Sequence, residues 1–410
     1  MSLLSVEQAK QRILSQFQPV STEKVPLSTC TNRVLATDII AADDLPLFDN
    51  SSMDGFALRA SDSSNAAPAS PVTLSVVADI PAGSTPTVSL AAGQAARIMT
   101  GAQMPNGADA VIPVEDTDFN DRSAGTAPPK TVSIPRPVQS YENVRRRGMD
   151  VRTGNVILKT GIRINAQSVG ILAMLGFAEV DVYNRPRVAL LSSGDELLEV
   201  GDPLEPGKIR DTNSSMLASL IQDTGAEVLR LGIADDTNDS VTGLLEKAVD
   251  ENVDMIITSA GVSVGAFDYV KEVVETNGSL NFWRVNMRPG KPLAFGEYKN
   301  IPFIGLPGNP VSAFVGFEVF VRGALGKLCG LPDESRQTVR VRCEEEITSD
   351  GRESYLRAII NGKDGQYFAK LTGHQGSGNL LSLVQANALL IIPAGVKCVP
   401  AGQEVNAWPL

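Results

Sequence analysis

Glycine- and hydroxyl-rich turns follow three apolar segments in the middle of the chain. They span 192–196 (SSGDE), 259–265 (SAGVSVG, with Asp268 close behind) and 306–312 (LPGNPVS). Glycine lets a backbone approach a ligand closely, and the N–H groups at the start of a helix attract anions. The three turns favour a phosphate-bearing ligand. Each one alone is also consistent with an ordinary turn or a well-capped helix.

Two basic segments stand out against an acidic background. The chain has a formal net charge of −11, so an anionic substrate needs cations gathered locally. Arg288 and Lys291 belong to a loop stiffened by proline and glycine (288–292, RPGKP), and 145–150 (RRRGMD) is a dense basic cluster. A stiff loop loses little conformational freedom on binding. A solvated loop and an inter-domain network of ion pairs are the respective alternatives.

Carboxylates are the available metal ligands. His374 is the only histidine, and the four cysteines are scattered along the chain. This argues against a histidine-dependent triad and a multi-histidine zinc site. Acidic residues follow the expected strands at Glu196, Asp235, Asp236 and Asp268. Carboxylate oxygens favour Mg²⁺, which completes its shell with phosphate and water, so the pattern indicates phosphoryl or nucleotidyl chemistry.

Alternating strands and helices must position the central turns. Strand-like runs occur at 188–191, 227–233, 255–258, 280–285 and 303–306. Helical patterns occur at 213–224, 239–250, 269–275 and 310–328. This alternation predicts a doubly wound, mostly parallel sheet with helices on both faces. The carboxyl ends of its strands then lie at one edge, where ligands usually bind.

The flanking regions are β-rich, apart from two expected helices. Short apolar runs separated by turn residues fill 25–144, and the runs after residue 337 suit a small barrel or sandwich. A helix is predicted over 5–17, beginning with a capping box. A strand and a helix are predicted over 156–177. The fold class is therefore α/β multidomain, with β-rich N-terminal and C-terminal domains.

Composition limits the classes of partner and the cell compartment that we expect for this protein. An acidic chain with a pI near 4.8 lacks the average charge of a nucleic-acid binder. The N-terminus does not resemble a signal peptide, and no apolar run is long enough to span a membrane. The scattered cysteines are expected to be reduced and buried. We therefore expect a cytoplasmic protein that acts on small molecules.

Across these segments the chain resembles the molybdopterin molybdenumtransferase family, which includes bacterial MoeA and the E domain of gephyrin. The resembling segments occur in the family's order and span nearly the whole chain: FDNSSMDGFA (48–57), RIMTGA (97–102), RRRGMD (145–150), LSSGDEL (191–197), DTN (211–213), SAGVSVGAFDY (259–269), RPGKP (288–292), GLPGNPVSA (305–313) and TGHQGSG (372–378). The resemblance implies insertion of molybdate into adenylylated molybdopterin, with Mg²⁺ assistance and release of AMP.

The resemblance also implies an elongated homodimer of four-domain subunits. The expected domains are a linking and dimerisation domain (1–26 and 146–178), a β-rich domain (27–145), an α/β domain that binds molybdopterin (179–329) and a C-terminal β-barrel (330–410). The α/β domain is expected to look like the preceding pterin adenylyltransferase. That enzyme and the acceptor molybdoenzymes are the implied protein partners.

The family's functional residues carry over motif by motif. The catalytic carboxylates are Asp54, Asp150, Glu196 and Asp268, and the metal ligands are Glu196, Asp268 and one of the pair Asp235 and Asp236. The substrate-binding positions are Thr100, Arg147, Ser192, Ser193, Gly194, Ser259, Gly261, Ser263, Gly265, Pro307, Gly308 and Asn309. The molybdate-contacting positions are Arg288, Lys291, Ser312, Arg357 and Ser377.

The chain departs from the family pattern at four positions. Arg288 replaces a usual Lys, which changes the donor geometry, and Ala260 replaces a Gly. Ser193 stands for a Thr, and Gly378 stands where a His often follows.

Two other functions are alternatives to molybdate insertion. A pterin adenylyltransferase would share the central motifs but needs neither 48–57 nor 145–150, and a non-catalytic scaffold would bind a partner peptide.

Overall fold

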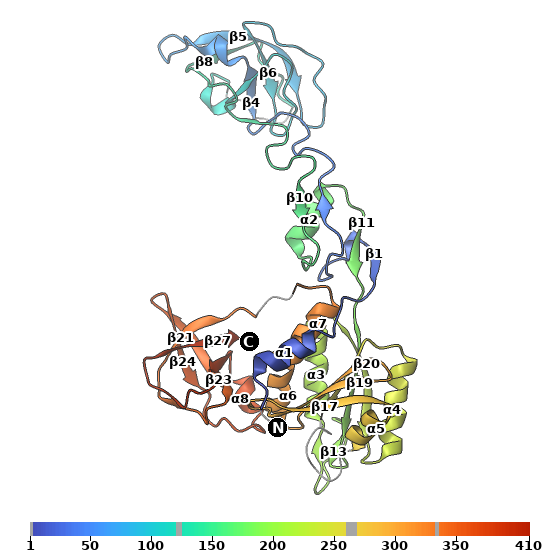
Figure 1. Ribbon diagram of the computed structural model, residues 1–410. Coiled ribbons are helices and arrows are strands. Elements are labelled where there is room, and N and C mark those ends of the chain that lie inside the picture. Colours follow the sequence, from blue (N-terminus) through green and yellow to red (C-terminus); the bar gives the residue numbers. More distant parts are fainter. Residues whose placement is uncertain (1–2, 120–124, 260–268, 333–335) are drawn as a thin grey trace. The chain divides into compact units, whose positions relative to one another are not determined.

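The computed structural model describes residues 3–119, 125–259, 269–332 and 336–410, and only the backbone of 282–284 (Figure 1). The chain forms two compact units. The central unit comprises Met1–Thr37, Thr160–Ala173 and Phe177–Leu410, and the inserted unit comprises Asp38–Lys159 and Met174–Gly176. Within the described ranges, no helix combines the length and apolar character needed to cross a membrane.

A six-stranded sheet forms the middle of the central unit, in the order β15-β12-β16-β20-β19-β17. Its strands are β12 (Arg187–Ser193), β15 (Glu227–Ala234), β16 (Met255–Ser259), β17 (Gly278–Arg284), β19 (Pro292–Tyr298) and β20 (Ile301–Leu306). The first four strands in this order are parallel, whereas β19 and β17 are antiparallel additions. The predicted mostly parallel sheet is confirmed. Strand β19 was not anticipated.

Helices cover both faces of this sheet, as predicted. Along β12, Val188 and Leu190 face one core, whereas Ala189 and Leu191 face the other. The first core includes side chains of α3 (Thr212–Asp223) and α6 (Pro310–Gly316). The second includes side chains of α4 (Asn238–Asp250) and α5 (Tyr269–Asn277), which Figure 1 shows side by side. Alternation along a strand buried on both faces produces this division.

The single helix predicted over 310–328 is interrupted. Helix α6 leads into a π-helical turn, η4 (Phe317–Val321), and then into α7 (Arg322–Leu328). Glu318 lies buried in the π turn and accepts two hydrogen bonds from Arg322, each of 2.8 Å. Arg336 also pairs with Glu318. The two arginines neutralise a carboxylate that burial would otherwise disfavour.

Two shorter helices begin where the sequence predicts. Helix α1 (Val6–Leu14) is preceded by Ser5, whose hydroxyl accepts a bond from the Gln8 N–H while the Gln8 side chain bonds back to the Ser5 N–H. Helix α2 (Ala166–Met174) follows Asn165, whose Oδ1 accepts a bond of 2.8 Å from the Ser168 N–H. Beside them, strand β1 (Thr22–Pro26) pairs with β11 (Glu179–Tyr183).

The C-terminal strands close into a barrel. The strands β21 (Val339–Cys343), β23 (Glu353–Lys363), β24 (Gln366–Leu371), β25 (Ala388–Ile392) and β27 (Glu404–Pro409) pair in the order β23-β24-β21-β27-β25, and β25 pairs again with β23. A barrel rather than a sandwich is therefore formed. The short strand β18 (Met287–Arg288) joins it by pairing with β23, although it precedes the barrel by more than 50 residues.

The inserted unit is β-rich, as predicted. Its sheet has the order β7-β4-β6-β5-β8, with β4 (Gly55–Leu58), β5 (Val72–Ile80), β6 (Gln94–Ile98), β7 (Ala110–Pro113) and β8 (Thr131–Ile134). Strand β3 (Asn50–Ser51) pairs with β9 (Val144–Arg145), which brings the 48–57 and 145–150 segments together. A Cβ on Gly55 would lie 2.0 Å from the Ile112 oxygen, so only glycine fits there.

The cysteines are free, but the expectation that all four are buried was wrong. Cys30, Cys329 and Cys343 are buried, whereas Cys398 is exposed. It belongs to the short strand β26 (Cys398–Val399), where burial alternates along the strand and Val399 faces inward instead.

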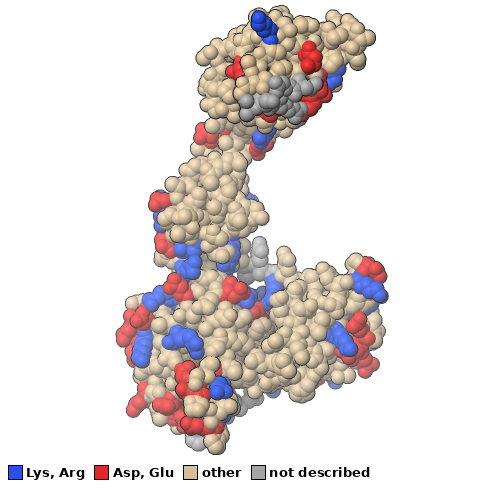
Figure 2. Space-filling view, turned by 180° about the vertical axis from the view of Figure 1, so that it is seen from behind, with Lys and Arg blue, Asp and Glu red and all other residues tan. Residues whose placement is uncertain are grey.

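On the molecular face drawn in Figure 2, lysine and arginine side chains of the described residues are interspersed with acidic ones.

Candidate functional site

The carboxyl ends of the parallel strands place three of the sequence motifs at one edge. Ser192 of β12 is in register with Ser259 of β16, and Ser259 is in register with Leu306 of β20. On the other side of β12, Ser193 is in register with Ala234, which precedes Asp235 and Asp236. The 192–196 turn, the 306–312 turn and the Asp pair therefore start from neighbouring strand ends.

The first turn of α3 joins these strand ends. Ser214 places its hydroxyl 2.8 Å from that of Ser192, and both residues are buried. Asn213 donates from Nδ2 to the Ser259 hydroxyl and to the Gly308 carbonyl oxygen, at 2.7 Å each. Sequence reasoning noted the 211–213 segment but gave it no role. The sequence signal that could have indicated a role is the pair of polar residues, ending at Asn213, directly after Asp211, which is the N-cap of α3.

Carboxylates gather beside the 192–196 turn. The Asp236 N–H donates to Asp195 Oδ1 at 3.1 Å, and the Asp195 N–H donates to Asp236 Oδ2 at 3.5 Å. Burial raises the pKa of Asp236 above its usual value, and the negative charges of Asp195, Glu196 and Asp235 raise it further, against the lowering effect of the Asp195 N–H. The site thus has an excess of negative charge that a cation would relieve.

Gly194 has a backbone conformation that favours glycine, and the Glu196 side chain lies close to it. Its φ is +147°, and a Cβ there would lie 2.4 Å from Glu196 Oε2. The Glu196 carboxylate therefore folds back over the turn. Among the described residues, no three or more His, Cys, Asp or Glu side chains form a group able to hold a metal ion. The fourth expected ligand, Asp268, lies outside the described residues.

A buried arginine forms the centre of a second cluster. Arg357, on barrel strand β23, is fully buried. Its Nε donates to the Ser382 hydroxyl and its Nη2 to the Gly376 carbonyl oxygen, at 3.0 Å each. Its Nη1 is buried and has no hydrogen-bond partner among the described residues. Burial lowers the pKa of Arg357 to about 10, and the positive charge of Arg288 contributes to the lowering. A cation in this state favours an anionic ligand.

The other expected molybdate-contacting residues belong to the same cluster. A Cβ on Gly290, between Arg288 and Lys291, would lie 3.4 Å from the Ser312 backbone oxygen. The Ser377 carbonyl oxygen accepts a bond of 3.0 Å from the Val311 N–H. Ser312 is buried, whereas Lys291 is exposed. The 288–292 loop, the start of α6 and the 372–378 segment therefore meet around Arg357. We call these five residues, Arg288, Lys291, Ser312, Arg357 and Ser377, the Arg357 cluster.

One acidic residue, Asp350, lies near the Arg357 cluster. The pKa of Asp350 is lowered mainly by a hydrogen bond from Arg352, and the more distant Arg288 charge contributes last. Asp350 therefore has a cation of its own, with Arg352 Nη2 2.5 Å from Asp350 Oδ2. Within the described ranges, neither Arg288 nor Arg357 forms an ion pair with a carboxylate.

In the inserted unit, Asp54 and Thr100 form one pair. The Thr100 N–H and hydroxyl both donate to Asp54 Oδ1, at 2.7 Å each. Both residues are exposed. The strict geometry of Gly55, next to Asp54, fixes where this loop enters β4. The expected catalytic aspartate and the expected substrate-binding threonine, far apart in sequence, are thus in direct contact.

The 145–150 segment neutralises its own charge. Arg147 donates from Nε to Asp44 at 2.8 Å, and its N–H donates to Asp49 at 2.7 Å. Arg145 pairs with Asp150. The Thr153 N–H lowers the pKa of Asp44 most, and the Arg147 side chain lowers it further. Both interpretations of this cluster therefore have support, because its arginines are exposed and two of them, Arg145 and Arg147, already form ion pairs.

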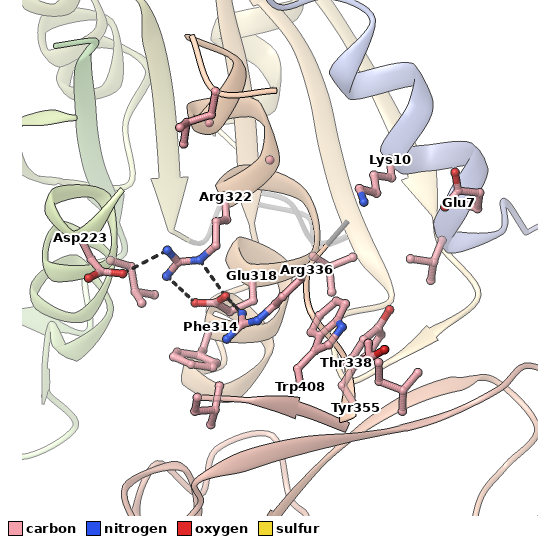
Figure 3. A pocket seen from close by; sticks show the side chains of 18 of the residues that line it. Glu7, Lys10, Asp223, Phe314, Glu318, Arg322, Arg336, Thr338, Tyr355 and Trp408 are labelled. Carbon is pink, nitrogen blue, oxygen red and sulfur yellow. Dashed lines mark hydrogen bonds and ion pairs between the residues drawn. The ribbon is translucent and has the colours of Figure 1, made fainter. Parts of the chain in front are cut away.

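A cavity of about 1160 Å³ lies apart from all these residues. Figure 3 shows Arg322 and Arg336 directed at Glu318, with Trp408 and Tyr355 beside them. None of the expected site residues lines this cavity. Its charged side chains are largely paired with one another, as in the Asp223–Arg322–Glu318 chain. The candidate chemistry is therefore at the strand-end turns and the Arg357 cluster.

Comparison with known proteins identifies the family. The chain is 40% identical over 391 residues to a protein of Nostoc sp. named Molybdopterin molybdenumtransferase, covering 94% of this chain and 88% of that protein. It is 39% identical over 414 residues to Molybdopterin molybdenumtransferase 2 of Mycobacterium tuberculosis, covering 99% of each. The chain belongs to the MoeA family. The resemblance stated from the sequence is confirmed.

Family models of three regions and a solved MoeA structure match nearly the whole chain. Residues 4–176 match the MoeA N-terminal region (domain I and II), 189–327 a probable molybdopterin binding domain, and 340–410 the MoeA C-terminal region (domain IV). The crystal structure of the molybdopterin biosynthesis moeA protein from Pyrococcus horikoshii has a TM-score of 0.84 and 31% identity, covering 100% of both chains. The multidomain α/β fold class is confirmed.

Several expected MoeA site residues differ in exposure from what their motifs suggest. Ser192 and Ser193 are buried, so they face the protein interior. Pro307 is buried, whereas Gly308 and Asn309 are exposed. Asn309 is the N-cap of α6, as predicted, but its side chain makes no capping bond. Three further substrate-binding positions, Gly261, Ser263 and Gly265, lie outside the described residues.

Proposed function

We propose that this MoeA protein inserts molybdate into adenylylated molybdopterin and releases AMP. The observation that carries this proposal is the Arg357 cluster, in which a buried guanidinium has one unpartnered nitrogen beside a second arginine. Guanidinium groups form strong charge-assisted bonds to oxyanions. Molybdate is a doubly charged oxyanion, so it suits this site. The names of the two relatives support the same reaction.

The strand-end turns are the proposed site for the pterin and the nucleotide phosphates. Gly308 and Asn309 are exposed at the start of α6, and Gly194 supplies a turn without a side chain. Ser312 belongs to both regions, because it follows the 306–309 turn and lies against the 288–292 loop. An anhydride held at the turns and an oxyanion held at Arg357 would therefore be bound by adjoining parts of the same unit.

Magnesium is the proposed metal of the acidic cluster. Glu196, Asp235, Asp236 and Asp268 would hold it, and their carboxylate oxygens are the ligands that Mg²⁺ prefers. Mg²⁺ commonly takes only one or two protein carboxylates and completes its shell with phosphate and water. Burial raises the pKa of Asp236 and the nearby carboxylates raise it further, and a bound cation would offset both effects. When bound, the metal would offset the negative charge of the phosphoanhydride.

Asp54 and Asp150 are the proposed catalytic residues of the inserted unit, with Thr100 and Arg147 as substrate contacts. Thr100 orients the Asp54 carboxylate through two hydrogen bonds. The Arg145–Asp150 ion pair holds the second carboxylate. These contacts fix the side chains before substrate arrives, which lowers the entropy lost on binding.

The assembly and the cellular setting are also proposals. We infer a homodimer of four-domain subunits with the boundaries given above, located in the cytoplasm. Its protein partners would be the adenylyltransferase that makes its substrate and the molybdoenzymes that receive its product. Light scattering of the purified chain tests the dimer, and a monomeric mass would contradict it.

The proposed reaction is tested by AMP release from adenylylated molybdopterin. Release should require molybdate and should increase with Mg²⁺, and Asp268→Asn should lower it. Equal release without molybdate would contradict the coupling of insertion to anhydride cleavage. ATP consumption with unmodified molybdopterin would instead identify an adenylyltransferase. Absence of both reactions, with retained peptide binding, would identify a scaffold.

A further inference from the structure

Asn213 has hydrogen bonds that its helix does not need. It lies in the first turn of α3, where Asp211 already caps the helix by accepting a bond of 3.0 Å from the Ser214 N–H. The Asn213 amide reaches across to two other elements instead. It donates to the Ser259 hydroxyl at the end of β16 and to the Gly308 carbonyl oxygen after β20.

We propose that Asn213 is a positioning residue that holds the end of β16, at Ser259, and the turn after β20 at a fixed separation. The inference rests on the proposed function, in which the strand-end turns bind a pyrophosphate-bearing pterin. Asn213 itself is 7% exposed, so its role is exerted through Ser259 and Gly308. Neither of these two groups could keep its bond if the turns moved apart, because both bonds are only 2.7 Å long.

The remaining polar atom of Asn213 argues against a purely stabilising role. Its Oδ1 is buried and accepts no hydrogen bond from the part of the chain that the structure describes. A buried acceptor without a partner opposes folding, so the side chain is a poor choice for stability alone. A shape-matched apolar side chain would remove that penalty but could not bond the two turns. The amide is therefore explained by the geometry that it imposes.

Ser214 shows how the same helix turn reaches a third strand. Its hydroxyl contacts that of Ser192 at the end of β12. The first turn of α3 therefore contacts the ends of β12 and β16 and the turn after β20. Asp211 provides a matched control, because it is equally buried and stabilises the same helix turn without bonding any of the three.

The test compares Asn213→Ala, the volume-keeping Asn213→Leu and the control Asp211→Ala in the AMP-release assay. Loss of two hydrogen bonds should raise KM for adenylylated molybdopterin roughly 10- to 30-fold in both Asn213 variants. Asp211→Ala should lower the melting temperature and leave KM close to that of the wild type. A wild-type KM in Asn213→Leu would show that packing, not hydrogen bonding, matters, and the inference would be wrong.

A double-mutant cycle shows whether Asn213 acts through Ser259. Asn213→Ala and Ser259→Ala remove the same hydrogen bond, so the double variant should raise KM by clearly less than the product of the single effects. Asp211→Ala combined with Ser259→Ala should give the product of its single effects. Multiplicative effects for the Asn213 pair would contradict the proposal.

Hydrogen exchange provides a reading that does not depend on the substrate. The backbone amides of Gly308 and Asn309 should exchange faster in Asn213→Ala than in Asp211→Ala when both are measured without ligand. If the wild-type protein releases no AMP, the proposed function fails while this measurement still decides the role of Asn213. Unchanged exchange in Asn213→Ala would sink the positioning role even in an active enzyme.

Discussion

Two regions of this protein contain neighbouring arginines, and the two regions leave the arginine charge in different states. Arg357 is fully buried in the barrel, with one guanidinium nitrogen unpartnered and Arg288 nearby. Arg147, in the inserted unit, has a side chain that is 65% exposed and pairs with Asp44 at 2.8 Å. The first region lacks a counter-ion among the described residues, whereas the second provides its own.

The difference shows that a dense basic run in a sequence is a weak guide to an anion site. The 145–150 segment contains three consecutive arginines, yet carboxylates close in space neutralise two of them. Arg357 stands alone in an ordinary strand sequence, but the fold buries it and places a second cation beside it. Affinity for an oxyanion depends on what the surroundings leave unpaired.

Replacement of Arg357 should have the largest effect of the substitutions, and the effect should be on oxyanion affinity. Arg357→Met should weaken molybdate or tungstate binding by about 100-fold, the effect of losing charge-assisted hydrogen bonds in a buried site. Arg357→Lys should recover part of the affinity, because lysine keeps the charge but loses the planar fork. Isothermal titration calorimetry measures both constants. Arg340→Met is the control, because the Arg340 side chain on strand β21 is exposed. Equal loss in the control would refute the assignment.

Oxyanion binding at Arg357 should also have a characteristic pH dependence. Burial lowers the pKa of Arg357 to about 10, which remains above neutral pH. Below that pH the folded protein carries the charge at a loss of stability, and a bound anion relieves it. Above it the charge and the binding are both lost. Affinity should therefore be level near neutral pH and fall as pH rises through about 10. A fall near neutral pH would contradict Arg357 as the main contact.

Asp54→Asn should come next and should act on the reaction only. Replacing the charged acceptor of two Thr100 bonds should slow AMP release by roughly 10- to 100-fold. Molybdate affinity should stay unchanged, because Asp54 is not one of the five residues of the Arg357 cluster, which is the proposed molybdate site. Steady-state AMP release and calorimetry separate the two effects. Thr100→Ser, which keeps the hydroxyl donor, is the control and should retain most of the activity.

Arg147→Ala should have a small effect on stability. Its ion pair with Asp44 is exposed, and such pairs contribute about 0–1 kcal/mol to the free energy of unfolding. Urea denaturation should therefore detect little change, and added salt should reduce the change further. A rise in KM without loss of stability would support substrate contact. A large loss of stability with unchanged KM would favour the ion-pair network as its role.

Asp236→Asn should produce a modest gain in stability, with a defined pH dependence. Burial and like charges raise the pKa of Asp236, so the ionised folded state is disfavoured. No penalty applies below the ordinary aspartate pKa of about 3.9, and the penalty grows as pH rises from there through the raised value. The variant should be more stable than the wild type near neutral pH and equal to it in acid. Thermal unfolding across pH checks this.

Magnesium sharpens the same test. If Asp236 is a ligand, Mg²⁺ should raise the wild-type melting temperature more than that of Asp236→Asn, because a bound ligand stabilises the folded state. Asp239→Asn, at the start of α4 and outside the proposed ligand set, is the control. An equal Mg²⁺ effect in all three proteins would remove Asp236 from the metal site.

Local patterns determined much of the fold. The capping box of α1, the Asn165 cap of α2 and the alternation of apolar strands and helices all follow from residue spacing. The same patterns placed the 192–196 and 306–312 turns at the carboxyl edge of a parallel sheet, because right-handed crossovers leave no other arrangement. Asn213 was overlooked because its partners, Ser259 and Gly308, are distant in sequence.

The tertiary structure alone decided which charges remain unpaired. Strand β18 pairs with β23 and thereby brings Arg288 near Arg357, although about 70 residues separate them. The π turn at Glu318, the antiparallel strand β19 and the closure of the barrel also depend on contacts between distant segments. Spacing records the neighbours of a residue along the chain. The neighbours of an arginine in space decide whether it forms an ion pair with a carboxylate or remains available to bind an anion.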